Sequence, residues 1–137
     1  MIAVDADARA VAALRKLAAQ STPARARIDA VVGDFTRLAD VEALRDVPLD
    51  GALLANALHF TRDPAPVLED VAGRLRPGGR LIVVEYEGRP ANRWVPYPID
   101  RARVAGIAAD LGLGPPQQLG ERRSRYGGVM YAVSLTR

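Results

Sequence analysis

Four apolar runs recur along the chain, and each is followed by a polar or glycine-containing break. They span residues 1–4, 28–32, 50–55 and 80–86. These runs are apolar at nearly every position instead of alternating, as expected for strands buried on both faces of a parallel sheet. Residues 117–123 and 129–136 alternate in polarity instead, which predicts an antiparallel pair joined through Tyr126-Gly-Gly128.

Three other segments place apolar residues three and four positions apart, the spacing of an amphipathic helix. The first follows Asp7, whose side chain can cap it, and ends before Ser21-Thr22-Pro23. The second starts at Pro64, where a missing N–H costs no hydrogen bond, and the third spans residues 100–111. Between the second helix and the strand at 80–86, Arg76-Pro-Gly-Gly79 predicts a tight turn.

Strands that alternate with helices for 111 residues, followed by a hairpin, indicate an α/β fold. We expect a doubly wound, mostly parallel sheet with a C-terminal antiparallel hairpin. The chain has 137 residues, of which 49% are hydrophobic and 26% charged, which suits one compact unit. Residues 1–137 are therefore predicted to form a single domain.

The composition excludes several kinds of chemistry. The chain has no cysteine and one histidine, so we expect no disulfide, no cysteine nucleophile and no metal site. No apolar run reaches membrane-spanning length and no signal peptide is recognisable, so we expect a cytoplasmic protein without a membrane partner. The net charge is only +3 and the arginines are scattered, which argues against a nucleic-acid partner.

Candidate site residues follow from the rule that open α/β sheets bind ligands at the carboxyl ends of their strands. The rule selects residues at four strand ends: Asp5, Ala6 and Asp7; Asp34 and Phe35; Asn56 and His59; and 85–87. Two carboxylates and an aromatic ring suit a nucleoside, because carboxylates accept hydrogen bonds from ribose hydroxyls and from an exocyclic amino group. Equally, Asp5 or Asp7 can cap a helix, Asp34 can be a turn residue and Phe35 can be core.

Four stretches, in this order, resemble the class I S-adenosylmethionine-dependent methyltransferases. They are Ile2-Ala-Val-Asp5, Val31-Val-Gly-Asp-Phe35, the segment 49–60, and the segment 68–83 with its Pro-Gly-Gly. The resemblance implies S-adenosylmethionine as cofactor, with Asp5 and the adjoining Ala6 at the ribose and Asp34 and Phe35 at the adenine. It also implies that Asn56 lines the methyl end of the site.

On the substrate side the sequence leaves alternatives open. His59 is a candidate general base, against the alternative of a packed, loop-stabilising histidine. Arg93, Trp94 and Tyr97 lie in the irregular segment after the strand at 80–86 and can form a substrate wall, or Trp94 can anchor that loop on the core. The chain lacks the Asn-Pro-Pro-Tyr pattern of DNA amino-methyltransferases, which favours a small-molecule acceptor.

One departure from the family is large. Its first strand and the glycine-rich loop after it have no counterpart in these residues. The family's strand order is 3-2-1-4-5-7-6, so the strands at 1–4 and 50–55 would both pair with the missing strand, and each is expected to have an unpaired edge. We therefore interpret the chain as N-terminally truncated and expect it to bind S-adenosylmethionine weakly or not at all. The alternatives are a degenerate remnant, or closure of the gap by direct pairing, another segment, a partner chain or self-association.

Three functions remain in competition. The first is a methyltransferase, or its C-terminal portion, that transfers a methyl group by in-line displacement. The second is a catalytically inactive remnant or interaction domain with the same fold. The third is a nicotinamide-dependent oxidoreductase, since Asp5 suits the ribose of NAD equally well. Against the third, Lys16 is the only lysine and no Tyr-x-x-x-Lys pair is present.

Overall fold

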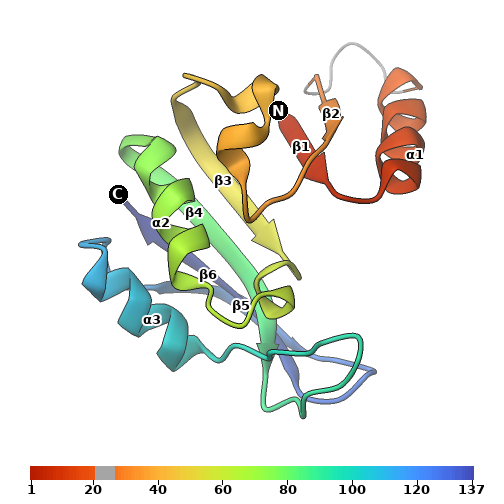
Figure 1. The fold of residues 1–137 in the computed structure, drawn as a ribbon. Helices are drawn as coiled ribbons and strands as arrows, with labels where there is room; N and C mark the ends of the chain where they lie inside the picture. The colour runs from red at the N-terminus through yellow and green to blue at the C-terminus, as the bar shows by residue number, and fades with distance from the viewer. Residues whose placement is uncertain (21–26) are drawn as a thin grey trace. The chain divides into compact units, whose positions relative to one another are not determined.

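The computed structural model describes residues 1–20 and 27–137. The chain divides into two compact units, Met1–Val47 and Pro48–Arg137, and each is described by itself. Figure 1 shows the elements of both units. The expectation that residues 1–137 form a single domain stays a prediction.

The first unit is a parallel strand pair with one helix. Its elements are β1 (Ile2–Asp5), α1 (Ala8–Ala19), β2 (Asp29–Val32) and the 3-10 helices η1 (Leu38–Asp40) and η2 (Glu42–Leu44). β1 and β2 pair in parallel, with Ile2 opposite Asp29 and Asp5 opposite Val32. Among its described residues, the buried apolar side chains are Val11, Ala30, Leu38, Val41 and Leu44.

The second unit is a four-stranded sheet with two helices. In chain order it contains β3 (Leu49–Ala55), η3 (Leu58–Phe60), α2 (Ala65–Arg74), β4 (Leu75–Glu87), α3 (Arg101–Asp110), β5 (Gln117–Arg123) and β6 (Val129–Thr136). The strand order is β3-β4-β6-β5; β3 pairs with β4 in parallel, and β6 is antiparallel to both of its neighbours. The α/β fold with a C-terminal antiparallel hairpin is thereby confirmed.

The core of the second unit lies between one face of the sheet and helices α2 and α3, which are drawn in front of the sheet in Figure 1. Leu81, Val83 and Glu85 of β4 are buried, and the register pairs them with Leu135, Val133 and Tyr131 of β6, which are also buried. The opposite face carries half-buried residues of β4 and, on β3, Leu53 with 61% of its surface exposed. Our expectation that the four apolar runs form strands buried on both faces is wrong for β3, of which only Leu54 is buried.

The segment Arg76-Pro-Gly-Gly79 differs from prediction. It forms a bulge inside β4 instead of a separate turn before the strand, because Leu49 pairs with Leu75 and Gly51 already pairs with Arg80. Gly78 has φ +78°, and a Cβ on Gly79 would lie 2.8 Å from the carbonyl oxygen of Arg76. Glycine is therefore required at these two positions for the strand to form the bulge.

The remaining predictions concern edges and boundaries. β1 and β3 are each the last strand of their own sheet, and the unpaired edges expected on these two strands stay a prediction. The predicted helix end at Ser21-Thr22-Pro23 lies outside the described residues. None of the helices in the described part of the chain is long and apolar enough to cross a membrane.

Candidate functional site

Two of the predicted carboxylates lie at neighbouring strand ends of the first unit. Asp5 is the last residue of β1, and Asp34 follows β2 after Gly33, whose N–H donates to the Asp5 carbonyl oxygen at 3.0 Å. Asp7 caps α1, since its Oδ1 accepts from the Arg9 N–H at 2.8 Å. Asp5 therefore does not cap the helix; its Oδ1 accepts from the Asp7 N–H at 2.8 Å, and its Oδ2 makes no hydrogen bond with the described residues.

Asp34 is held in a turn. Its Oδ1 accepts from the Thr36 hydroxyl at 2.7 Å and from the Thr36 N–H at 2.8 Å. These two donors keep the pKa of the Asp34 carboxyl below its ordinary value, since they stabilise the ionised form. The turn interpretation left open by the sequence is thus realised, yet Oδ2 of this exposed side chain has no partner within the described part of the chain.

Close packing fixes the backbone between these two acids. A Cβ on Gly33 would lie 2.7 Å from a methyl carbon of Val41 and 3.0 Å from one of Val4, so only glycine fits. Ala6 is exposed beside Asp5, and Phe35 is half-buried beside Asp34. The first unit therefore brings together all four residues that were predicted for the ribose and the adenine.

The second unit places Asn56 at the carboxyl end of β3 in an unusual state. Its φ of +55° lies in the left-handed region, which few residues other than glycine adopt, and its N–H donates to the Val84 carbonyl oxygen at 2.9 Å. Its side-chain Oδ1 is buried and has no hydrogen-bond partner among the described residues. Asparagine adopts this region more readily than most residues, so the buried, unpartnered Oδ1 is what makes Asn56 a binding candidate.

His59 and Glu85 form a buried pair. Glu85 is completely buried on β4, and its Oε2 lies 2.7 Å from Nδ1 of His59. Its Oε1 accepts from the N–H of Leu58 at 2.8 Å and from that of His59 at 3.3 Å. One carboxylate thus holds both the ring and the backbone of the 3-10 helix after β3.

This pairing bears on the two interpretations of His59. In the tautomer that donates from Nδ1 to Glu85, Nε2 carries the ring's lone pair, and no described residue hydrogen-bonds to Nε2. The side chain is only 4% exposed and packs against Phe60 and Tyr86, at ring-centroid distances of 4.4 and 5.9 Å. These contacts are those of a packed, loop-stabilising histidine, and a role as general base stays a prediction.

Sequence reasoning selected Glu85 only as a strand-end residue and missed its bond to His59. A signal was present in the alternation of β4, where Leu81, Val83 and Glu85 occupy every second position. A carboxylate in the inward phase of a strand must find donors, because a buried charge without them is very costly. Backbone and ring N–H groups that follow the neighbouring strand are suitable donors.

The loop after β4 holds the three predicted substrate residues. Trp94 is 65% exposed with the Arg93 guanidinium 4.4 Å from its ring, and Tyr97 is 42% exposed. Val95, only 3% exposed, is the buried anchor of this turn, so the alternative that Trp94 anchors the loop is wrong. The Tyr97 N–H donates to the His59 carbonyl oxygen at 3.0 Å, which joins this loop to the segment after β3.

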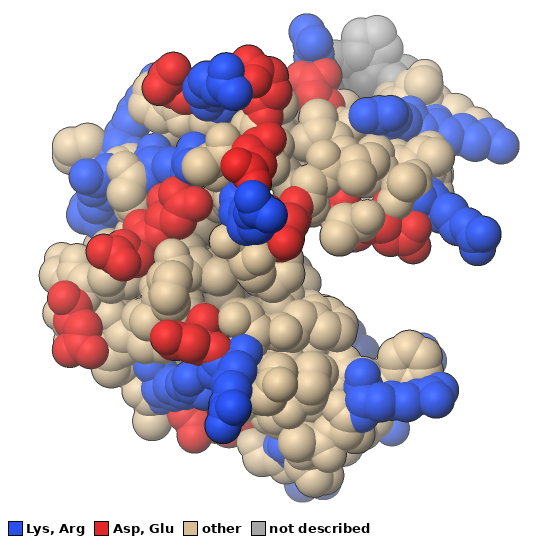
Figure 2. Space-filling view, viewed as in Figure 1, with Lys and Arg blue, Asp and Glu red and all other residues tan. Residues whose placement is uncertain are grey.

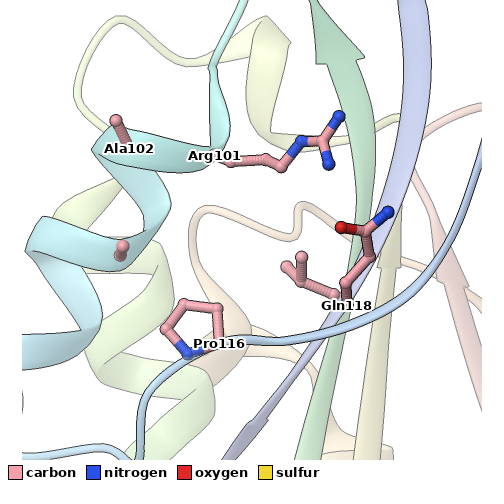
Figure 3. A pocket seen from close by; sticks show the side chains of 6 residues that line it. Arg101, Ala102, Pro116 and Gln118 are labelled. Carbon is pink, nitrogen blue, oxygen red and sulfur yellow. The ribbon is translucent and has the colours of Figure 1, made fainter.

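A pocket of about 300 Å³ lies elsewhere in this unit, between α3 and the β5–β6 hairpin (Figure 3). Its lining residues are Arg101, Ala102, Ala105, Pro116, Gln118 and Val133. The Arg101 guanidinium is already neutralised, with Nε 2.6 Å from Glu87 and an Nη 2.7 Å from Glu121, and both carboxylates raise its pKa. None of the predicted site residues lines this pocket.

Comparison with known proteins identifies the family. A model described as a methyltransferase domain matches residues 1–83, more than half of the chain. The match covers β1, β2 and β3, whose carboxyl ends carry Asp5, Asp34 and Asn56. No curated protein sequence matches the chain.

Solved structures share the fold at low sequence identity. An S-adenosylmethionine-dependent methyltransferase from Methanosarcina mazei is 13% identical with a TM-score of 0.71, and the match covers 99% of this chain and 81% of that one. The N-methyltransferase NodS from Bradyrhizobium japonicum, bound to S-adenosyl-L-homocysteine, is 12% identical (TM-score 0.74; 99% and 65% covered). The arsenic(III) methyltransferase CrArsM from Chlamydomonas reinhardtii is 15% identical (TM-score 0.73; 98% and 54%). The chain thus spans less than two thirds of the last two structures. With the family model and the fold in agreement, the chain belongs to the class I S-adenosylmethionine-dependent methyltransferase family.

Proposed function

We propose that this chain functions in S-adenosylmethionine-dependent methyl transfer to a small-molecule acceptor. The observation that carries the proposal is the family match, which spans every strand end that holds a predicted cofactor residue. Asp5, Asp34 and Asn56 each also offer a side-chain oxygen that has no hydrogen-bond partner in the described residues. Unengaged acceptors at these positions fit a ligand rich in hydroxyl and amino donors.

Different residues are assigned to different parts of the cofactor. In this proposal Asp5 accepts hydrogen bonds from the ribose hydroxyls, with Ala6 beside them, and Asp34 accepts from the adenine amino group. Phe35 is half-buried, so part of its flat ring remains available to cover a base. Asn56 lines the methyl end through its buried Oδ1.

The cofactor, when bound, supplies a methyl group already activated by a sulfonium. The protein's residues therefore have to align the acceptor and exclude water, which are the contributions that positioning supplies. Where the acceptor must lose a proton, we assign the lone pair of His59 Nε2 to that task. Glu85 is then a positioning residue that fixes the ring through Nδ1, at 2.7 Å.

An NMR titration tests this function against its nicotinamide alternative. The uniformly ¹⁵N-labelled chain is titrated separately with S-adenosyl-L-homocysteine, the stable product of the cofactor, and with NAD⁺. We expect saturable amide shifts at Asp5, Ala6, Asp34, Phe35 and Asn56 with the former only. Binding should be weaker than about 1 μM, because no glycine-rich cofactor loop is among these residues.

Two results would count against the proposal. Equal shifts with NAD⁺ would favour the oxidoreductase, and the absence of shifts at millimolar S-adenosyl-L-homocysteine would favour an inactive remnant or interaction domain. A dissociation constant of 1 μM or below would leave the function standing but overturn the expectation of weak binding.

A further inference from the structure

Arg89 carries a charge that no acid in the described residues neutralises. It follows β4 directly after Gly88, and its guanidinium carbon lies 4.7 Å from the Tyr86 ring centroid and 5.9 Å from that of Tyr126. Its Nε is buried without a hydrogen-bond partner among the described residues, and no carboxylate of that part of the chain forms an ion pair with it. The side chain is thus held by two aromatic rings while its charge and one N–H remain uncompensated.

Arg101 shows what a structural arginine looks like in the same region. It bonds to Glu87 at 2.6 Å and to Glu121 at 2.7 Å. Glu87 is the last residue of β4 and Glu121 lies within β5, and both are paired with Arg101 and not with Arg89. If Arg89 served only to tie the fold together, a carboxylate or carbonyl partner of this kind would be expected.

The two segments next to Arg89 carry positive charge, and the acids that border them, Glu87 and Glu121, are already paired with Arg101. The loop 88–98 and the hairpin segment 122–128 contain no aspartate or glutamate, and together they carry five arginines: Arg89, Arg93, Arg122, Arg123 and Arg125. Figure 1 draws the two segments side by side at the lower end of the sheet, and blue side chains project from this region in Figure 2. Charges of one sign gathered around a half-buried arginine raise the local concentration of anions.

Backbone packing shows that the two segments approach each other closely. Val129, at the start of β6, pairs with Glu87, and a Cβ on Gly128 would lie 2.6 Å from the Glu87 carbonyl oxygen and 3.0 Å from Cβ of Arg89. Gly128 also has φ +70°. Only glycine therefore allows the hairpin to bring Tyr126 to the guanidinium.

Arg89 also lies on the side of the sheet where the acceptor is expected. Tyr86, which stacks on Arg89, has its ring centroid 5.9 Å from the ring of His59. Tyr97 joins the same loop to His59 through the backbone. One ring thus separates the uncompensated arginine from the residue assigned to deprotonate the acceptor.

We propose that Arg89, held between Tyr86 and Tyr126, binds an anionic group of the methyl acceptor, a carboxylate or a phosphate. The inference rests on the proposed methyl-transfer function and adds the acceptor's chemical class. Both anions present two oxygens that match the planar fork of a guanidinium, and the stacked rings pre-organise that fork. The acceptor is therefore a small molecule with one acidic group and a separate methylated atom.

The test uses benzoate and inorganic phosphate as probes, titrated into the ¹⁵N-labelled chain at constant ionic strength with sodium chloride. We expect saturable shifts at Gly88, Arg89, Gly127 and Gly128 with at least one probe. A larger response to benzoate indicates a carboxylate, and a larger response to phosphate indicates a phosphoryl group. Shifts with neither probe would overturn the proposal.

Variants distinguish anion binding at Arg89 from a nonspecific effect of the protein's positive charge. R89Q should raise the dissociation constant of the responding probe at least about fivefold. R89K should raise it as well, because lysine keeps the charge but lacks the planar fork of the guanidinium. R80Q removes the same charge from an exposed position in the middle of β4 and should leave the affinity unchanged. If R89Q fails to fold, R89K carries the comparison; equal affinity in wild type and the Arg89 variants would overturn the assignment.

The titration distinguishes the two proposals, because anion binding needs no cofactor. Anion shifts at Arg89 without S-adenosyl-L-homocysteine shifts at Asp5 and Asp34 would contradict the proposed function while the anion site stands. Shifts with S-adenosyl-L-homocysteine at Asp5 and Asp34 without anion shifts at Arg89 would leave the proposed methyl transfer standing and contradict the proposal of an anionic acceptor.

Discussion

Acids at the strand ends of the two units have opposite environments. In the first unit Asp5 and Asp34 are exposed, and each uses one carboxylate oxygen for a local backbone contact. In the second unit Glu85 is completely buried, and both of its oxygens are engaged by Leu58 and His59. An acid at a strand end is therefore available to a ligand only where the fold leaves an oxygen unpaired.

This difference in burial arises from the position of each acid in the inward–outward alternation of its strand and not from residue type. Glu85 lies in the inward phase of β4, in register with Tyr131, and must be satisfied by protein donors. Asp5 ends its strand, its side chain is exposed, and its Oδ1 accepts from the N–H of Asp7 just before α1. The exposed acids should thus matter for binding and the buried acid for stability.

Removal of the buried acid should have the largest effect. Glu85→Ala leaves two backbone N–H groups and the His59 ring N–H without an acceptor, so the free energy of unfolding should fall by about 3 kcal/mol. Urea denaturation at pH 7 measures this. Glu69→Ala, at an exposed position of α2, is the control and should change stability by less than about 0.5 kcal/mol. A similarly small loss for Glu85→Ala would show that the buried pair does not hold the fold.

Tyr131 provides a second, smaller test of the buried side. Its hydroxyl donates to the Ile99 carbonyl oxygen at 3.0 Å, so Tyr131→Phe should cost about 1 kcal/mol at pH 7. Burial raises the pKa of the Tyr131 hydroxyl above its ordinary value near 10. As the pH rises, the hydroxyl therefore ionises in the unfolded state before it ionises in the folded state. Wild-type stability should therefore decline as the pH rises above 10.

The variant separates this contribution from other alkaline effects. Tyr131→Phe has no hydroxyl to titrate, so urea denaturation between pH 9 and pH 11 should show a shallower decline than for wild type. Parallel declines in the two proteins would mean that Tyr131 contributes nothing to the pH dependence.

The smallest effect is expected at Asp34. Thr36 lowers the pKa of this carboxyl, so the ionised form adds stability that is complete above the ordinary pKa and is lost as the pH falls through the lowered one. Asp34→Asn should cost less than about 0.5 kcal/mol at pH 7, because the side chain is exposed. The difference in stability between wild type and variant should narrow as the pH falls through the lowered pKa of Asp34, and a difference that stays constant on acidification would contradict the stated cause.

Local features of the fold could be predicted from the sequence, because they depend on neighbouring residues. The bounds of β5 and β6, the cap at Asp7 and the start of α2 after Pro64 follow from alternation, capping and proline geometry. The bulge at Gly78 and Gly79 was predicted as a separate turn, because its pairing with β3 is set by tertiary register. Turn chemistry alone does not show whether a strand continues on both sides.

Contacts between distant segments could not be predicted in this way. The bond between His59 and Glu85 joins residues 26 positions apart, and the stacking of Arg89 on Tyr126 requires the final hairpin to return beside β4. Trp94 was a plausible loop anchor by size, but the smaller Val95 is the buried residue. Periodicity identifies apolar faces, whereas which loop residue enters the core depends on the path of the chain.

The most direct test of the account is the affinity of the Asp5→Asn variant for S-adenosyl-L-homocysteine. Asparagine keeps an oxygen that can accept from the Asp7 N–H, so the fold should be unchanged while the acceptor for the ribose is weakened. NMR titration should give a dissociation constant at least about fivefold above that of wild type, or about 1 kcal/mol. The control Asp110→Asn, at an exposed position on α3, should match wild type. Equal constants for wild type and Asp5→Asn would contradict the claim that the exposed strand-end acids hold the cofactor.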